Sequence, residues 1–251
     1  MSGQPPLLDG RVAVVTGATS GIGRASAIRL AELGATIVVG YHSRNEAAED
    51  LVGSLPGTGH IAVRIALETS ASITEAARAV EERFGRVDIL VNSGGATEVV
   101  PADDLDGLTD EIFDRVTRIN LRGPFAAIRA FQPLLAKGEN AAIVNISSIA
   151  ARTGVGSNLA YCAAKAGLDA LTIGLAKVLA PEIRVFSVSP AGVDTDFVPG
   201  RPRARLEATA RQTPLAKITS VDDVARAVIA CVTLMTSSTG IVIPVDEGRH
   251  L

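Results

Sequence analysis

The strongest constraint on the fold of this chain is a repeated alternation between short, uninterrupted apolar runs and longer amphipathic stretches. Runs such as Val-Ala-Val-Val lack polar alternation, so both faces of each strand are expected to be buried. The pattern predicts one domain over residues 1–251, an α/β fold with a doubly wound parallel sheet and helices on both faces. Its strands are predicted at 11–16, 36–39, 60–65, 87–91, 141–146, 183–189 and 240–245.

Several helix boundaries carry sequence signals. Ser72 and Glu75 have the spacing of a capping box, and Ser220 precedes a stretch that continues to Met235. Gly34 and Gly85 follow apolar helical periods, where a left-handed cap requires a residue without a Cβ atom. These signals predict helices that begin at Ser72 and Ser220.

Charge and cysteine content exclude several functional classes. The chain has 24 Lys and Arg against 27 Asp and Glu, a net charge of −3, so it has no basic field for nucleic acid. Two cysteines are too few for a disulfide framework. No apolar run reaches the roughly 18 residues of a membrane span, and residues 1–6 lack signal-peptide features. We therefore expect a cytoplasmic protein with no membrane partner.

Metal chemistry is not expected. His42, His60 and His250 lack the spacing of metal ligands, and the acidic run 103–106 is predicted to be a solvated loop because it lacks further spaced ligands.

A glycine-rich turn follows the first predicted strand, in the sequence Thr16-Gly17-Ala-Thr-Ser-Gly21-Ile-Gly23. Glycines let backbone N–H groups approach a pyrophosphate, and the N-terminus of the following helix favours negative charge. A glycine cluster can also be only a tight turn. Its position after the first strand of a βαβ unit favours a dinucleotide site.

Tyr161 and Lys165 are four residues apart in a predicted helix over 157–179, so they share one face. A nearby ammonium favours a phenolate, which a tyrosine needs to act as an acid and base near neutral pH. The pair alone is more often ordinary helix surface. Ser148 strengthens the interpretation because it follows strand 141–146, at the end of the sheet where ligands bind.

Taken together, these motifs resemble the short-chain dehydrogenases/reductases, particularly the branch similar to 3-oxoacyl-[acyl-carrier-protein] reductases. The resemblance rests on the glycine turn, Asn92-Ser-Gly-Gly95, Asn120, Ser148 and Tyr161-x-x-x-Lys165, in that order. It implies a single-domain Rossmann fold with a seven-stranded sheet, in a homotetramer. It also implies NAD(P)-dependent hydride transfer between nicotinamide and a small-molecule carbonyl or secondary alcohol, a 3-oxoacyl thioester or a small ketone.

The resemblance also implies roles for individual residues. Ser148 would hydrogen-bond the substrate oxygen, Tyr161 would exchange its proton, Lys165 would also bind the nicotinamide ribose, and Asn120 would hold a water. Ser147 is the alternative to Ser148. The cofactor residues implied by the resemblance and by the turn are Gly17, Thr19, Ser20, Gly21, Ile22, Gly23, Tyr41, Ser43, Arg44, Asn92, Gly94, Tyr161, Lys165, Pro190, Gly192, Val193 and Thr195.

Three segments depart from the family pattern. Ala66-Leu67 replaces an Asp-Val pair beside the adenine, Glu247 interrupts a Val-Asp-Gly-Gly ending, and Gly192 is displaced by one residue. The adenine pocket and the C-terminal subunit contact are left open. Small residues on the Tyr161 helix favour helix–helix contact between subunits, or packing on the sheet: Ala163, Ala164, Gly167 and Ala170.

Cofactor choice follows from the segment after the second strand. NAD-preferring relatives carry an acidic residue there, but Tyr41 takes that place, followed by Ser43 and Arg44, which can donate to a 2′-phosphate. Arg24 could assist. NADP(H) is favoured and NAD(H) stays possible, because Arg44 could simply begin a solvated helix and Ser20 lacks a basic side chain.

A Pro- and Arg-rich segment, about 193–218, is expected to be a mobile, exposed loop that closes over the substrate. The rival hypothesis is a catalytically silent dinucleotide-binding sensor or scaffold, since fold alone does not imply catalysis. Dehydration or epimerisation is a weaker third possibility.

Overall fold

The structure is a computed structural model that describes residues 7–251; the segment 1–6, examined above for a signal peptide, lies outside the described residues. Seven parallel strands form one sheet in the order β3-β2-β1-β4-β5-β6-β7. This confirms the predicted fold. The strands are β1 Val12–Thr16, β2 Thr36–Tyr41, β3 Ile61–Arg64, β4 Ile89–Asn92, β5 Ala141–Ile146, β6 Ile183–Pro190 and β7 Ile241–Val245.

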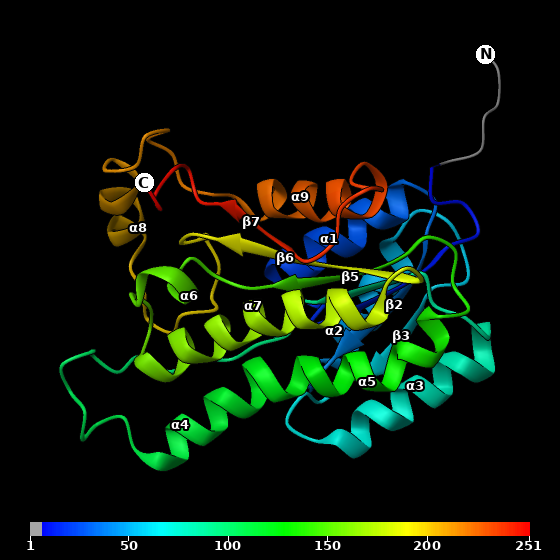
Figure 1. Cartoon of the computed structure of the whole chain (residues 1–251), viewed down its shortest axis with the longest axis horizontal. Helices are drawn as coiled ribbons and strands as arrows, with labels where there is room; N and C mark the ends of the chain where they lie inside the picture. Colours follow the sequence, from blue (N-terminus) through cyan, green and yellow to red (C-terminus); the bar gives the residue numbers. More distant parts are fainter. Residues whose placement is uncertain (1–6) are drawn as a thin grey trace.

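Helices cover both faces of the sheet (Figure 1). One apolar core lies under α1 (Gly21–Glu32), α2 (Asn45–Ser54) and α9 (Val221–Thr233). A second core lies under α3 (Ser70–Phe84), α5 (Gly123–Leu135) and α7 (Leu159–Leu179). The remaining elements are α4 Asp110–Thr117, the π-helix η1 Arg118–Arg122, α6 Ala150–Thr153 and α8 Arg203–Ala210.

The strand order reverses between β1 and β4, which pair directly although β2 and β3 separate them in sequence. Ligands of doubly wound sheets bind beyond the carboxyl ends of the strands at such a switch point. In Figure 1 these ends point toward α6 and α8, on the left.

The helix caps are mostly as predicted. Ser220 and Asp223 form a capping box at the start of α9, and Gly34 and Gly85 have φ values of +98° and +71°. The capping box at Ser72 was wrong. The helix begins two residues earlier, and the buried Ser72 hydroxyl accepts the Ala66 N–H at 3.1 Å, where it satisfies the loop after β3.

By length and composition alone, α7 would be long and apolar enough to cross a membrane, although no uninterrupted apolar run had suggested this. It packs against β6, and it buries Lys165 on its inner side. An apolar helix buried in this way is what the core of a doubly wound sheet requires.

The sequence analysis expected segment 193–218 to be a mobile, exposed loop. The structure differs, because the segment contains the helix α8. Its two ends meet in an isolated parallel bridge between Val193 and Thr219. Leu206 and Ala210 of α8 are buried, which anchors the helix against the rest of the domain. The segment is therefore an insertion whose two ends are held together and whose helix packs against the domain.

At the amino ends of the strands, buried charge is paired. Asp88 has no exposed surface, and its carboxylate accepts the backbone N–H groups of Val12 at 2.9 Å and Glu139 at 2.7 Å, together with the Arg86 guanidinium. The carboxylate thus joins β1, β4 and the turn before β5.

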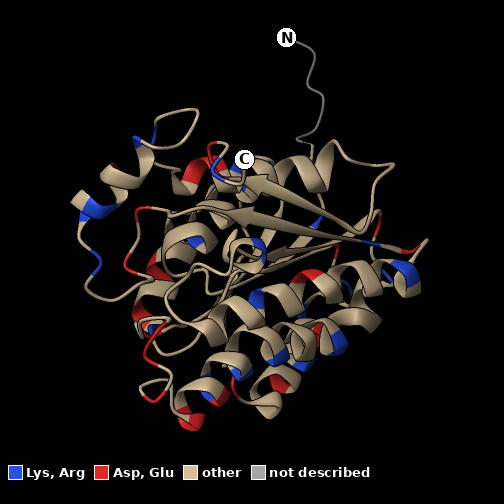
Figure 2. Ribbon diagram, turned by 60° about the vertical axis from the view of Figure 1, so that its left-hand side comes forward, with Lys and Arg blue, Asp and Glu red and all other residues tan. Residues whose placement is uncertain are grey.

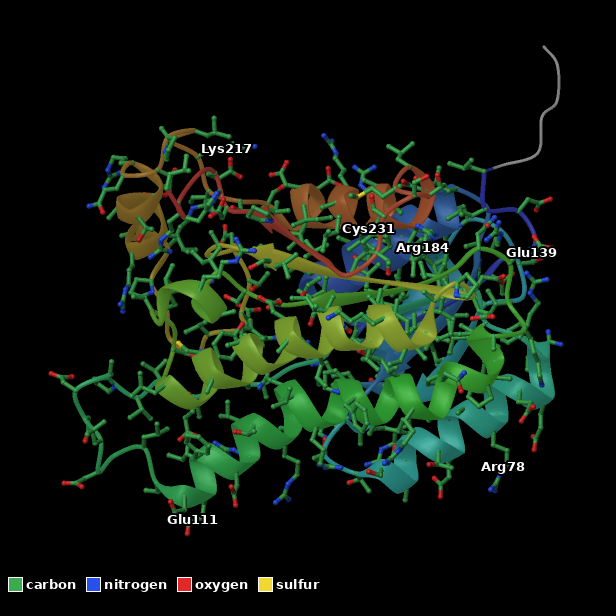
Figure 3. All side chains as sticks on the ribbon, in the orientation of Figure 1. Arg78, Glu111, Glu139, Arg184, Lys217 and Cys231 are labelled. Atoms are coloured by element: carbon green, nitrogen blue, oxygen red, sulfur yellow. The ribbon has the colours of Figure 1, made fainter. Side chains whose placement is uncertain are left out.

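Arg184, on β6, closes the C-terminal end of α9. Its guanidinium donates to the carbonyls of Cys231, Val232 and Met235 and to that of Asn140, at 2.9–3.2 Å. Figure 3 shows Arg184 beside Cys231, on the side of the molecule away from α8. A cation at this place satisfies the free carbonyls of the last helical turn.

Candidate active site

One large cavity, of about 1390 Å³, opens at the carboxyl ends of the strands. The glycine turn, the residues after β4, β5 and β6, the first turns of α7 and the segment around α8 line it. Small-molecule sites typically measure roughly 300–1,000 Å³. The cavity can therefore hold a dinucleotide and a second molecule together.

The glycine turn has the geometry that close approach to a ligand requires. Gly17 and Gly21 have positive φ values of +63° and +52°. A Cβ atom on Gly17 would lie 2.7 Å from the Gly94 Cα atom, so the turns after β1 and β4 touch through their backbones. The Thr16 hydroxyl accepts the N–H groups of Ser93 and Gly94 and fixes this contact.

Most of the sequence-predicted cofactor residues line this cavity. They are Gly17, Thr19, Ser20, Gly21, Ile22, Ser43, Arg44, Gly94, Tyr161, Lys165, Pro190, Gly192, Val193 and Thr195.

Three predicted cofactor residues lie behind the wall. A Cβ atom on Gly23 would lie 2.4 Å from the Gly17 carbonyl oxygen, so this glycine serves the turn itself. Tyr41 packs on the apolar core under α1 and α2. The Asn92 side chain is buried, and it donates to the Asn145 side chain at 2.9 Å. The roles of Tyr41 and Asn92 in cofactor binding stay predictions.

Ser148 and Tyr161 both line the cavity, and the Ser148 hydroxyl lowers the pKa of Tyr161. The Ser148 oxygen accepts the Ala150 N–H at 3.2 Å. The neighbouring Ser147 hydroxyl is buried and donates to the Lys165 carbonyl at 3.4 Å. Of the two serines, Ser148 is thus the one that acts on the Tyr161 hydroxyl.

The start of α7 holds Tyr161 in place. The side chain of Asn158, at the N-cap, accepts the Tyr161 N–H at 2.7 Å, and the Tyr161 ring packs on Phe197 with 5.7 Å between centroids. Burial raises the pKa of the Tyr161 phenol to about 12, and the Ser148 hydrogen bond only partly opposes this. The hydroxyl is therefore protonated at neutral pH.

Lys165 lies one turn along the same face, with its Nζ atom 5.6 Å from the centroid of the Tyr161 ring. The Nζ atom donates to the Ile146 carbonyl at 2.7 Å. Burial lowers the Lys165 pKa to about 8, and nearby Asp169 partly opposes this. The sequence analysis expected Lys165 to lower the tyrosine pKa. In this structure desolvation dominates the Tyr161 pKa, and the groups that lower it are Ser148 and Arg201.

Asn120 lies in η1, a π-helical turn between α4 and α5. Its Nδ2 atom donates to the carbonyls of Ala96 and Val116, and its buried Oδ1 atom has no protein partner in the described chain. π-Helical turns occur frequently at functional sites. The free Oδ1 atom, directly behind the cavity wall, fits a water-holding role.

Sequence reasoning located the substrate pocket only by segment: the loop after Phe197, the residues around Ala96 and the stretch 150–158. Among the side chains of these segments, Phe197, Arg201, Thr97 and Ser157 line the cavity, and the hydroxyls of Thr97 and Ser157 bond to each other. The Pro- and Arg-rich texture of segment 193–218 was the signal for Phe197 and Arg201. No signal singled out the side chains of Thr97 and Ser157 within their segments.

The departures from the family pattern have local explanations. Leu67 fills the space beside Gly94, where a Cβ atom would lie 2.7 Å from the leucine Cδ1 atom. Glu247 adopts a φ of +60° and forms an ion pair with Lys217 at 3.5 Å, which ties the C-terminal segment to segment 193–218. Within residues 7–251, no group of three or more His, Cys, Asp or Glu is arranged to hold a metal.

Comparison with known proteins identifies the family. A family model described as Enoyl-(Acyl carrier protein) reductase matches residues 17–250. The chain is 33% identical over 245 residues to the 3-oxoacyl-[acyl-carrier-protein] reductase FabG of Thermotoga maritima, covering 96% of this chain and 98% of that protein. The chain belongs to the short-chain dehydrogenase/reductase family.

Two further relatives fit the same family. A D-threitol dehydrogenase of Mycolicibacterium smegmatis is 40% identical over 197 residues, 76% of this chain and 73% of that protein. A solved short-chain dehydrogenase/reductase of Brucella melitensis, described as SDR:Glucose/ribitol dehydrogenase, superposes with a TM-score of 0.90 at 29% identity. The match covers 99% of this chain and 100% of that chain. The protein is an NAD(P)-dependent oxidoreductase that transfers a hydride between nicotinamide and a carbonyl or alcohol carbon.

Proposed function

We propose that Ser148, Tyr161, Lys165 and Asn120 carry out the proton chemistry of this oxidoreductase. The observation that carries the proposal is that Ser148, Tyr161 and Lys165 line one cavity, with the Lys165 Nζ atom 5.6 Å from the centroid of the buried Tyr161 ring. The bound nicotinamide supplies or accepts the hydride. Ser148 would hold the substrate oxygen, and the protonated Tyr161 would donate to it during reduction.

Lys165 and Asn120 act on the proton path in this proposal. The Lys165 Nζ atom uses one N–H on the Ile146 carbonyl, which leaves two for the cofactor ribose and for a water. The unpartnered Asn120 Oδ1 atom would accept from that water. The proton lost by Tyr161 would then be replaced from solvent.

This arrangement favours catalysis over a silent sensor or scaffold. A sensor would need the dinucleotide wall alone, whereas here a hydroxyl pair and a buried lysine meet beside it. Perturbed pKa values in a cleft are typical of catalytic groups. Dehydration or epimerisation is the less favoured alternative.

For the substrate, we propose a small ketone or the corresponding secondary alcohol, with a 3-oxoacyl thioester as the alternative. Relatives named as a D-threitol dehydrogenase and a cis-4-hydroxycyclohexanecarboxylate dehydrogenase act on alcohols of this size. The second, from Sinomonas cyclohexanicum, is 36% identical over 244 residues. We propose that segment 193–218 encloses this substrate.

A panel of small ketones and 3-oxoacyl thioesters, assayed with both reduced cofactors, tests the proposal. Turnover of any member supports an enzyme. Cofactor binding without turnover on the whole panel would reject both proposed substrate classes.

We further propose that NADP(H) is preferred. Arg24, Ser43 and Arg44 line the cavity wall near the carboxyl end of β2, which ends in Tyr41 and not in an acid. Arg44 immediately precedes α2, so the helix N-terminus also favours an anion. NAD(H) stays possible because Arg44 is exposed.

Kinetics with NADPH and NADH on one substrate test this preference. We expect Arg44→Ala to lower kcat/KM for NADPH by about 10-fold, because it removes one hydrogen bond from a charged group. The value of kcat/KM for NADH should be unchanged. Arg78→Ala on exposed α3, labelled in Figure 3, is the matched control. A preference for NADH, or an NADPH value indifferent to Arg44→Ala, would reject the assignment.

We propose a cytoplasmic homotetramer in which residues 1–251 act as one unit. Ala163 and Ala170 are exposed on α7, whereas Ala164 is buried and Gly167 packs on Leu121. The two exposed alanines support helix contact between subunits. Light scattering at micromolar protein tests the assembly, and a monomeric mass would reject it.

A further inference from the structure

The substrate end of the cavity has an apolar wall and one half-buried cation. Phe197 packs on the Tyr161 ring, and Val155 and Arg201 line the same space. Figure 2, with Lys and Arg in blue, shows basic residues along the segment around α8, from which Arg201 comes. Arg201 follows Phe197 by only four residues, and its charge lowers the pKa of Tyr161, so both side chains of this short stretch act on the same tyrosine.

The Arg201 guanidinium is held in place by a hydrogen bond, but no acidic side chain in the described residues pairs with its charge. One Nη atom donates to the Val193 carbonyl, which fixes the group at the base of the segment. Its Nε atom is buried and has no hydrogen-bond partner. Asp194, the adjacent acid, is paired with Arg203, and no ion pair of Arg201 occurs among residues 7–251. Donors therefore remain free on a fixed guanidinium.

Burial makes this lack of an anion costly. The pKa of Arg201 is lowered, chiefly by desolvation, and Arg205 adds repulsion, while Asp194 and the Tyr161 hydroxyl partly compensate. A buried donor without a hydrogen-bond partner is destabilising, and more so when the group is charged. An anionic group on a ligand would offset this cost.

We propose that Arg201 is a specificity-determining residue that binds a carboxylate on the substrate, so that the enzyme acts on oxo acids and the corresponding hydroxy acids. The inference rests on the proposed function of the same site. With the carbonyl oxygen at Ser148 and Tyr161, a carboxylate on the same small molecule would face Arg201. The planar, forked guanidinium matches the two oxygens of a carboxylate.

The phosphates of the cofactor are a second source of anionic oxygen. Val193 and Gly192, the neighbours of Arg201, belong to the wall assigned above to the cofactor. The association of Arg201 with Phe197 and Tyr161 favours the substrate. The two sources predict different effects of removing Arg201, on substrate discrimination in one case and on cofactor affinity in the other.

The test compares 4-oxopentanoate with its methyl ester, which keeps the ketone and removes the charge; 3-oxobutanoate and 5-oxohexanoate vary the spacing. We expect the wild-type enzyme to prefer at least one acid. We expect Arg201→Met to lower kcat/KM for that acid by about 10- to 100-fold and to leave the methyl ester within about threefold. Arg201→Lys should restore only part of the loss because it lacks the fork.

Arg211→Met is the matched control, because Arg211 is exposed just after α8 and does not line the cavity. It should leave both substrates unchanged. Equal losses for acid and ester in Arg201→Met, a wild type without preference for any acid, or a loss confined to NADPH affinity by fluorescence titration would overturn the proposal.

A binding measurement separates this inference from the proposed function. Calorimetry of pentanoate and pentanamide with the NADPH complex requires no turnover. Tighter binding of pentanoate that is lost in Arg201→Met supports the carboxylate site even if no ketone is reduced. If ketones are reduced but pentanoate and pentanamide bind with equal affinity, the proposed function is supported and the carboxylate site is rejected.

Discussion

The two ends of the sheet treat buried polar groups in opposite ways. At the amino ends, Asp88 receives three donors and Arg184 donates to four carbonyls; the Arg86 Nε atom is an exception without a partner. At the carboxyl ends, Asn120 Oδ1 and Arg201 Nε have no partner. At the amino ends of the strands, the hydrogen bonds of Asp88 and Arg184 thus stabilise the fold. At the carboxyl ends, polar atoms without protein partners remain for ligands to bind.

The difference has an energetic meaning. Each buried, unsatisfied polar group costs about 1–3 kcal/mol, a large share of a typical domain stability of about 5–15 kcal/mol. A fold can carry a few such groups only if other regions are well satisfied. Substitutions at the two ends should therefore separate stability from activity.

The largest effect is expected at the carboxyl end. Tyr161→Phe removes the proton donor but keeps the ring that packs on Phe197. Turnover should fall by about 10²- to 10⁴-fold while cofactor affinity stays close to that of the wild type. Urea unfolding should show little loss of stability. Retention of more than about a tenth of the wild-type turnover would exclude the proposed role.

At the amino end the expectation is reversed. Asp88→Asn removes a buried charge and leaves Arg86 only its 3.9 Å ion pair with exposed Glu139, so the free energy of unfolding should fall by about 3–5 kcal/mol. Urea denaturation measures this loss, with exposed Asp9→Asn as the control. The kcat of the folded fraction should be unchanged. A drop in kcat at unchanged stability would abolish the contrast between the two ends.

The titration of buried Lys165, at the carboxyl ends of the strands, makes the free energy of unfolding depend on pH. Its pKa is about 8 in the folded protein and 10.5 in the unfolded chain, so the unfolded state binds more protons between these values. Relative to Lys165→Met, the free energy of unfolding of the apoprotein should rise with pH from 8 to 10.5, by up to about 3 kcal/mol.

The Lys165 comparison uses chemical denaturation at several pH values. Tyr161, with a pKa near 12, acts in the opposite direction only above pH 10, and its titration is common to both proteins. Lys177→Met, at an exposed position of the same helix, should show no such rise. A flat difference between wild type and Lys165→Met would mean that Lys165 is not desolvated.

The smallest effect is expected at Arg184. Arg184→Met frees the carbonyls at the end of α9 but preserves much of the side-chain volume. The free energy of unfolding should fall by about 1.5–3 kcal/mol, measured by thermal or urea unfolding, with turnover unaffected. Amide hydrogen exchange should increase selectively in the last turn of α9. Uniform exchange across the chain would contradict local capping.

The sheet was predictable because its strands are buried on both faces, and such strands stand out in sequence as apolar runs. All seven lie within about two residues of the observed ends. The proposed catalytic pair was also readable, since the spacing of Tyr161 and Lys165 on one helix is a local property. Caps that depend on local glycines, such as Gly85, were predicted for the same reason.

Properties that depend on distant parts of the chain were not predictable. The Ser72 hydroxyl accepts a hydrogen bond from the loop after β3, and the Asn92 side chain donates to Asn145 on the neighbouring strand. The pKa of Tyr161 is set by the total burial around it, which local spacing does not reveal. The π-helical turn at Asn120 and the helix within segment 193–218 arise from tertiary packing that overrides weak local propensity.

The bridge between Val193 and Thr219 has an evolutionary consequence. Because the ends of the intervening segment are already held together, lengthening or replacing it leaves the strand register unchanged. The entropy of closing a flexible loop grows only with the logarithm of its length, about 0.6 kcal/mol for each doubling. The segment that we propose encloses the substrate can therefore diverge quickly, as an exchangeable insert on a scaffold whose own sequence is constrained by packing.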